Sequence, residues 1–314
     1  MKKIIYKFFR SLVKIFLPLI FQVLIKLKLN RRVINFLNEK SYYSNNKYNF
    51  FNLLQGLLKN KKIVGLDVGA QGGFNSDKFF PKKYNSFFEN VLIEPIKSEA
   101  EKLQENDVVI HRGLWSKKEK RKLYILDNRL GSSSMYEPNE MNFDLHNIKE
   151  KDHDKYKVTR TTEIECDTLF NQLSNLKIKN LDYLKIDTQG AELEILKGLG
   201  IYRPLLIKIE VHFFSIYKNV PSWHQLVNYL NELNYVLIDW KDIGDHVTRI
   251  PAEVDMIFIP NFNNEIGKKI ILDNKDKFLA IMLIFGQIKL LQVIMKKLKI
   301  TSEDLEKLED NYFN

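Results

Sequence analysis

Strand-like and helix-like segments alternate along the middle of the chain, from about Lys61 to Pro260. Runs rich in β-branched and apolar residues, such as Lys62–Val68 and Leu181–Ile186, are each followed by a turn and a helical pattern. Parallel strands need such crossover segments, because one strand ends at the opposite edge of the sheet from where the next begins. The sequence therefore predicts an α/β fold around a mostly parallel sheet.

The alternation fails between Asp127 and Thr161, where Gly131, three consecutive serines and Pro138 interrupt every periodicity. A segment of this length inside a compact domain is usually a functional lid or a disordered insert. Both interpretations stay open for this segment.

Both ends of the chain are predicted to be helical extensions, residues 1–58 and 263–314, around a central domain of residues 59–262. Lys3, Lys7, Arg10 and Lys14 recur at helical spacing beside apolar residues. The uncharged run Ile15–Ile25 is 11 residues long, whereas a membrane span needs roughly 20. Such a helix can lie on an anionic membrane surface, or it can pack on the core or on a second subunit. A homo-oligomer is therefore one of the expected states.

A second uncharged run, Phe278–Ile288, is followed by several lysines near the other end of the chain. It is also too short to span a bilayer. We therefore expect the two terminal segments to form an amphipathic helix pair that faces a partner or a membrane.

The chain carries a net charge of +10, but its lysines are spread over the whole sequence. There is no arginine-rich patch interleaved with aromatic residues, so nucleic-acid binding is not expected. A basic surface can instead serve an anionic membrane or an acidic substrate. Cys166 is the only cysteine, which excludes an intrachain disulfide and fits a reducing compartment. We expect a cytoplasmic protein, with ends able to bind the inner face of the plasma membrane.

The first strand runs into Asp67 and then into a glycine-rich turn that includes Gly69 and Gly73. Glycine lets the backbone turn sharply and approach a ligand, and ligands of open α/β sheets bind at such strand ends. A dinucleotide fingerprint needs glycine where Gln71 stands. The acid-first order suits a sulfonium cofactor, which has an amino-acid tail and no pyrophosphate. Asp67, Gly69, Ala70 and Gly73 are thus predicted to bind the cofactor, and a nicotinamide-dependent oxidoreductase stays an alternative.

Glu94 ends the second predicted strand and is followed directly by Pro95. A carboxylate at this position can accept hydrogen bonds from both ribose hydroxyls of a nucleoside cofactor. We therefore predict that Glu94 binds the cofactor as well.

Four further candidates, Asp187, Glu192, Glu210 and His212, lie at or after the ends of two later strands. Adjacent parallel strands are about 4.8 Å apart, so Asp187 and Glu210 can converge on one substrate group or one cation. All four are predicted catalytic residues, and Asp187 and Glu210 are also the candidate metal ligands. Asp187 can alternatively hold the amino group of the cofactor.

In this order the motifs resemble those of the FkbM-type methyltransferases, over roughly residues 60 to 240. The resemblance rests on Asp67–Ala70, Glu94-Pro95, Gly131–Ser134, Asp182–Glu192, Leu196–Gly198 and Ile209–Val211. Two positions depart from the usual family pattern. Gln189 stands where glutamate is more common, and Gln71 where asparagine is more common.

The resemblance implies a Rossmann-like class I methyltransferase fold, with a mostly parallel seven-stranded sheet and helices on both faces. It also implies S-adenosylmethionine as cofactor and a hydroxyl group as acceptor, typically on a sugar or a related metabolite. A neutral hydroxyl is a poor nucleophile, so a general base or a divalent cation such as Mg²⁺ must assist. A Lys- and Asn-rich composition and membrane-seeking ends favour a bacterial surface glycan or a lipid-linked saccharide. A non-catalytic, membrane-associated scaffold with the same fold is a further alternative.

Overall fold

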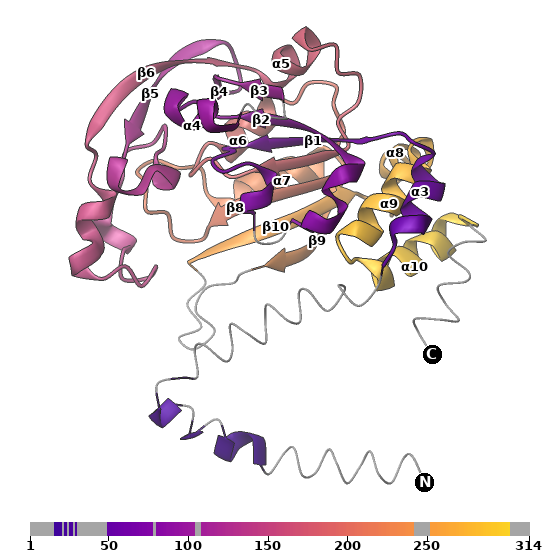
Figure 1. The fold of residues 1–314 in the computed structure, drawn as a ribbon, viewed down its shortest axis with the longest axis horizontal. Coiled ribbons are helices and arrows are strands. Elements are labelled where there is room, and N and C mark those ends of the chain that lie inside the picture. The colour runs from indigo at the N-terminus through magenta and orange to yellow at the C-terminus, as the bar shows by residue number, and fades with distance from the viewer. Residues whose placement is uncertain are drawn as a thin grey trace. The chain divides into compact units, whose positions relative to one another are not determined.

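The computed structural model describes residues 16–20, 22–23, 25–27, 29, 49–77, 80–103, 108–241 and 252–301. The chain divides into two compact units: Met1–Tyr48 with Asp245–Ile250, and Asn49–Gly244 with Pro251–Asn314. In the first unit, residues 16–20 are helical. The four basic residues that predict an N-terminal amphipathic helix lie outside the described residues. All elements named below belong to the second unit (Figure 1).

A seven-stranded sheet in the order β3-β2-β1-β7-β8-β10-β9 forms the centre of this unit. Its strands are β1 Ile63–Val68, β2 Phe88–Ile93, β3 Val108–Ile110, β7 Tyr183–Ile186, β8 Leu206–His212, β9 Tyr235–Lys241 and β10 Glu253–Pro260. β10 is antiparallel to both of its neighbours, and the other pairings are parallel. The winding reverses at β1, which places the carboxyl end of β1 at the switch point where such sheets bind ligands. The predicted class I methyltransferase fold is confirmed.

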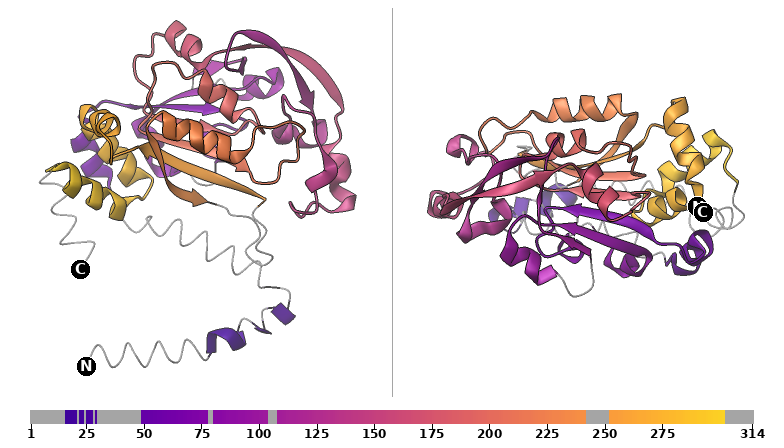
Figure 2. Two further views of the ribbon diagram at one scale, coloured as in Figure 1. Left: turned by 180° about the vertical axis from the view of Figure 1, so that it is seen from behind. Right: turned by 90° about the horizontal axis from the view of Figure 1, so that it is seen from above.

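Helices cover both faces of the sheet (Figure 2). They are α3 Phe51–Leu58, α4 Lys97–Ala100, α5 Leu169–Asn175, α6 Glu192–Lys197 and α7 Trp223–Glu232. β7 is buried at every position, and β1 at all but one, because side chains on both faces of these strands pack under helices or neighbouring strands. A strand that is buried on both faces needs apolar residues at successive positions, which is why these strands appear as apolar runs in the sequence.

A small second sheet carries the irregular segment across one end of the unit. Its strands are β4 Gly113–Leu114, β5 Glu119–Ile125 and β6 Arg160–Asp167, in the order β4-β6-β5. Between β5 and β6 the chain forms three short 3₁₀ helices, η5 Asp127–Ser132, η6 Glu140–Asn142 and η7 Glu150–Tyr156. We call residues 126–159 the cover segment. Phe143 and Tyr156 of this segment pack with Ile216 and Tyr217 from the loop after β8. The cover segment is therefore irregular but packed, which favours the lid interpretation over a disordered insert.

The three C-terminal helices are α8 Glu265–Asp273, α9 Lys275–Ile284 and α10 Ile288–Leu298. Every residue of Phe278–Ile284 is buried, and the following Phe285 packs on the ring of Tyr183 in β7, with ring centroids 4.9 Å apart. This apolar run therefore fills the core of the unit instead of facing a membrane or a partner. Among the helices of the described residues, none is long and apolar enough to cross a membrane.

Candidate active site

A cavity of about 610 Å³ lies at the carboxyl ends of β1, β2 and β7. Its lining includes three predicted site residues, Gly69, Glu94 and Asp187. Serines of the cover segment and Gln189 also line it. The structure thus brings motifs from three separate strands to one cavity.

The glycine turn after β1 is shaped by a close approach to β7. Gly69 has φ +80°, and a Cβ atom built there would lie 1.9 Å from the carbonyl oxygen of Asp187. A larger side chain at Gly69 would therefore push the two strand ends apart before it reached a ligand. Ala70 and Gly73 are buried and do not line the cavity. Both residues help to form the turn, and their predicted contact with the cofactor stays a prediction.

Asp67 also lies outside the cavity lining, although the sequence predicts it as a cofactor ligand. Its side chain is buried, and Lys185 Nζ lies 2.9 Å from Asp67 Oδ1. The two residues are directly opposite each other in the parallel pairing of β1 and β7. Burial raises the pKa of Asp67 while Lys185 opposes that rise. The signal missed in the sequence is a lysine inside an otherwise apolar strand, which indicates a buried partner of opposite charge.

Glu94 presents a carboxylate with unused acceptor capacity to the cavity. The side chain is 4% exposed, and Glu94 Oε1 accepts a hydrogen bond from the backbone N–H of Ile96 at 2.8 Å. No other described residue donates to it. Burial, together with the charges of Glu99 and Asp67, raises the pKa of Glu94 to about 7. A buried carboxylate with a free oxygen fits a ligand that supplies two hydroxyl donors, as a ribose does.

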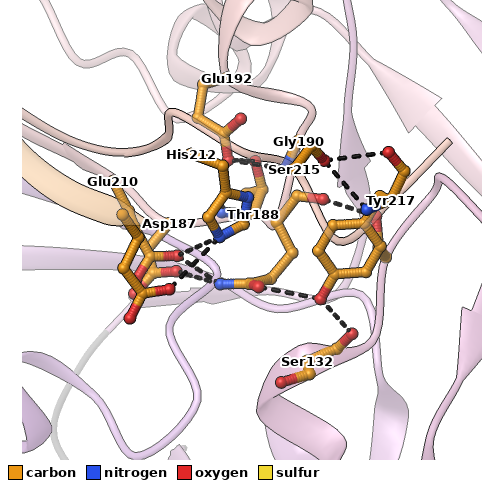
Figure 3. A network of polar contacts seen from close by, with 12 residues as sticks. Ser132, Asp187, Thr188, Gly190, Glu192, Glu210, His212, Ser215 and Tyr217 are labelled. Carbon is orange, nitrogen blue, oxygen red and sulfur yellow. Dashed lines mark hydrogen bonds and ion pairs between the residues drawn. The ribbon is translucent and has the colours of Figure 1, made fainter. Parts of the chain in front are cut away.

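Asp187, which lines the cavity, and Glu210, which does not, form an acid pair (Figure 3). The amide nitrogen of Gln189 donates to both carboxylates, at 3.1 Å to Asp187 Oδ1 and 2.5 Å to Glu210 Oε2. Burial favours the protonated form of both acids. Lys185 and hydrogen bonds from Glu210 and Gln189 nevertheless hold the pKa of Asp187 below its usual range. Burial and the charge of Asp187 raise the pKa of Glu210 well above its usual range. The surroundings thus favour the ionised form of Asp187 and the protonated form of Glu210.

Gln189 is the residue that joins the acid pair to the cover segment. Its backbone is left-handed, with φ 59°, a conformation that non-glycine residues adopt rarely and often at functional sites. The hydroxyl of Tyr217 lies 2.9 Å from Gln189 Oε1 and 2.7 Å from the carbonyl oxygen of Ser132. Ser134 Oγ donates to the carbonyl oxygen of Gln189 at 2.7 Å. The sequence indicated Gln189 only as a departure from a family pattern, and it did not indicate Tyr217 at all.

His212 contacts the acid pair from outside the cavity lining. Its Nε2 lies 3.9 Å from Glu210 Oε2 and 3.5 Å from Glu253 Oε2, and its ring stacks on Tyr217. Glu253 was missed because it begins an antiparallel strand far away in the sequence, with no motif around it. The structure thus places His212 beside Glu210 and outside the cavity lining.

Glu192 serves the backbone and does not reach the acid pair. Its side chain is buried, and its Oε1 accepts hydrogen bonds from the backbone N–H groups of Thr188 and Gly190, at 3.1 and 3.0 Å. A carboxylate in the first turn of α6 stabilises the free N–H groups there. These bonds fix the turn that carries Gln189, and the predicted catalytic role of Glu192 stays a prediction.

The acid pair does not have the geometry of a metal site. The Gln189 amide nitrogen donates to both carboxylates and so stands where a bridging cation would bind. Within the part of the chain that the structure describes, no three or more histidine, cysteine, aspartate or glutamate side chains are grouped to hold a metal ion. The donor arrangement thus fits proton transfer better than the predicted divalent cation.

Comparisons with known proteins agree with this geometry. The profile of the methyltransferase FkbM domain matches residues 67–237, more than half of the chain. A search of curated protein sequences finds no match.

Solved structures with a similar arrangement include three methyltransferases. One is an E. coli prophage protein assigned as a DNA modification methyltransferase (7% identity, TM-score 0.34, 63% of this chain and 47% of that one). The second is the 16S rRNA methylase ArmA (11% identity, TM-score 0.28, 74% of this chain and 90% of that one). The third is M. capricolum TrmK bound to S-adenosyl-homocysteine (14% identity, TM-score 0.28, 82% of this chain and 90% of that one). This chain thus spans about half the length of the first of them. With TM-scores this low, these similarities carry no argument about activity.

Proposed function

Because this chain belongs to the FkbM methyltransferase family, we propose that it transfers a methyl group from S-adenosylmethionine to a hydroxyl group of a saccharide. The proposed acceptor is a bacterial surface glycan or a lipid-linked sugar. One observation carries the choice of a hydroxyl: the carboxylate of Asp187 lines the cavity, and Lys185 beside it favours its ionised form by lowering its pKa. A hydroxyl must lose its proton as it attacks, so a carboxylate within reach is the group that this reaction needs.

The residues of the cavity fit this cofactor. Glu94 has a free acceptor oxygen for the ribose hydroxyls, and Asp187 and Thr188 line the end at which an amino-acid tail can be held. When bound, the cofactor supplies a methyl group on a positively charged sulfur, ready for in-line transfer.

The protein's own part in the reaction is to orient the hydroxyl and to take its proton. Asp187 accepts that proton. Glu210 is already protonated and therefore does not compete for it. Gln189 fixes the orientation of both carboxylates, and Tyr217, from the loop after β8, fixes Gln189 and links it to Ser132 of the cover segment.

The test is to supply the purified protein with labelled S-adenosylmethionine and with fractions of bacterial envelope. We expect label in the saccharide or lipid-linked saccharide fraction. Mass spectrometry of surface glycans from cells with and without the gene should then differ by one methylene group per acceptor. Label that enters only protein or nucleic acid would show that the acceptor is a different one.

The raised pKa of Glu94 makes cofactor binding pH-dependent. Ribose hydroxyls donate to the ionised carboxylate, so affinity for S-adenosylhomocysteine should rise between about pH 6 and pH 8, as Glu94 loses its proton near pH 7. Glu94→Gln should lower the affinity about tenfold or more and flatten the profile. Titration calorimetry measures both effects.

The matched control for this experiment is Glu101→Gln. Glu101 is exposed in the neighbouring 3₁₀ helix, where it pairs with Lys97. It should keep both the affinity and the pH profile of the natural protein. A Glu94→Gln profile that still rises through pH 7 would assign the titration to another group.

We also propose that the N-terminal segment binds anionic membranes. Four apolar side chains of its described part, Phe16, Leu17, Leu19 and Ile20, are each more than half exposed. Each basic residue near an anionic surface contributes about 1 kcal/mol, and salt screens this contribution. The protein should therefore sediment with anionic vesicles, less with neutral ones, and less at high salt.

Two variants test this proposal. A protein that lacks residues 1–30, and one in which Lys3, Lys7, Arg10 and Lys14 are replaced by glutamine, should both stay in the supernatant and still bind S-adenosylhomocysteine. If the segment instead packs on the protein or on a second subunit, the intact protein will ignore vesicles and the truncated one will aggregate or unfold earlier.

A further inference from the structure

One cation of the cofactor cavity has no role in the function proposed above. Arg112 lies in the turn between β3 and β4, and its side chain lines the cavity at the end away from Asp187. Its backbone runs beside Glu94, whose N–H donates to the carbonyl oxygen of Ile110 at 3.2 Å. Arg112 is therefore a close neighbour of the carboxylate that we assign to the ribose.

The guanidinium of Arg112 makes no hydrogen bond or ion pair with any other residue in the described part of the chain, although the residue is only half-exposed. The charge of Arg112 lowers the pKa of Asp167 in β6, but that carboxylate accepts its hydrogen bonds from the side chains of Asn171 and Gln172 and from a backbone N–H. A half-buried arginine usually pairs with an acid. An unpaired one in a cavity wall leaves its flat face and its donors available to a ligand.

The strand order decides which part of the ligand reaches Arg112. The sheet runs β3-β2-β1-β7, so the turn after β3 is three strands, or roughly 14 Å, from the end of β7. Glu94, at the end of β2, lies between them. With the ribose at Glu94 and the reacting end near Asp187, the base must extend toward Arg112. The other side chains at this end, Ile96 and Leu114, are apolar.

A second, open groove of about 1370 Å³ begins on the other side of Arg112 and runs under the β5–β6 hairpin. Arg112 lines both the groove and the cavity. Together with Pro95, Ile96 and Leu123, Arg112 therefore forms the wall between the two.

From this arrangement we infer that Arg112 binds the purine base of the cofactor, by stacking its guanidinium on the ring and closing the cavity at that end. The inference rests on the proposed function. Guanidinium groups stack on aromatic and nucleobase rings, which a point charge such as an ammonium does less well. Arg112 would thus help to select a purine nucleoside. An anionic acceptor is not its partner, because the acceptor must react at the opposite end of the cavity.

The experiment compares two ligands that share the adenosine part. S-adenosylhomocysteine carries an amino-acid tail with a carboxylate, and 5′-methylthioadenosine does not. Arg112→Met should weaken the binding of both ligands by the same factor, about tenfold, in titration calorimetry. A loss for S-adenosylhomocysteine alone would mean that Arg112 holds the carboxylate, and would overturn the inference. Unchanged affinity for both would overturn it as well.

Two further variants make the result specific. Arg112→Lys keeps the charge without the flat guanidinium and should still lose several-fold in affinity, whereas full affinity would show that charge alone suffices. Arg160→Met removes another arginine of the same groove, one that pairs with Asp127 and does not line the cavity. It should leave both affinities unchanged. If the natural protein binds neither ligand, the proposed function itself fails. If it binds both and Arg112→Met does too, only the role of Arg112 fails.

Discussion

Asp187→Asn is expected to lower methyl transfer by at least ~100-fold, which is the effect of losing a general base. Asparagine has nearly the same shape and can keep the hydrogen bond from Gln189, but its amide cannot take a proton from a hydroxyl. The rate of label transfer at saturating S-adenosylmethionine measures the effect. If saturating cofactor restores the natural rate, Asp187 holds the amino group of the cofactor and is not the base.

Glu210→Gln is the matched control for this result. Because burial and Asp187 keep Glu210 protonated, glutamine imitates the state that this residue already has. We expect a loss of less than about tenfold. Equal and large losses in the two variants would mean that Glu210 is not the protonated member of the acid pair, contrary to what the surroundings of the two acids indicate.

Lys185→Met is expected to destabilise the protein by about 3–5 kcal/mol, because it leaves the buried Asp67 without its partner. Without Lys185, the pKa of Asp67 in the folded state rises further above its unfolded value. Stability carried by a group with a raised pKa is present at low pH and is lost as the pH rises through the folded pKa. The variant should therefore lose more stability at pH 8 than at pH 5, in contrast to acid denaturation. Denaturant unfolding at the two pH values measures this.

Two controls separate the buried charge from the packing of the lysine chain. Asp67→Asn combined with Lys185→Met removes the buried charge of Asp67, so that only the partly exposed Asp187 loses its ion pair with Lys185, and it should recover part of the loss. Lys120→Met removes an exposed lysine that pairs with Glu163 and Glu165 on the small sheet and should leave the unfolding midpoint unchanged. If the double variant is as unstable as Lys185→Met, packing and not charge holds this part of the core.

The sequence was sufficient to predict the fold, because the strands and crossover helices of a parallel sheet each have a recognisable local pattern. Each buried strand requires a short continuous run of apolar residues, and each crossover requires a helical pattern after it. The acids at strand ends were also visible, since an ionisable residue that directly follows an apolar strand must lie at the edge of the sheet. Gly69, Glu94 and Asp187 could be placed in one cavity for this reason.

The roles of individual side chains depended on neighbours that are remote in the sequence. Asp67 and Asp187 follow the same local rule, yet Asp67 points into the core toward Lys185 and Asp187 lines the cavity. The apolar run Phe278–Ile284 reads locally like a membrane-facing or partner-binding helix, but it is buried in the core of its own unit.

The sequence by itself therefore determined which strand ends carry candidate site residues. The first strand is followed by a glycine turn, the second by an acid placed to bind a ribose, and a later one by the acid proposed to take part in methyl transfer. Only the tertiary structure decided which acids are buried and which of them favours its protonated form. It also showed that Gln189 and Tyr217 link the acid pair to the cover segment. The physical reason is that periodicity is a property of neighbouring residues along the chain. Burial, charge pairing and pKa arise between residues such as Asp67 and Lys185, which are 118 positions apart in the sequence and 2.9 Å apart in the fold.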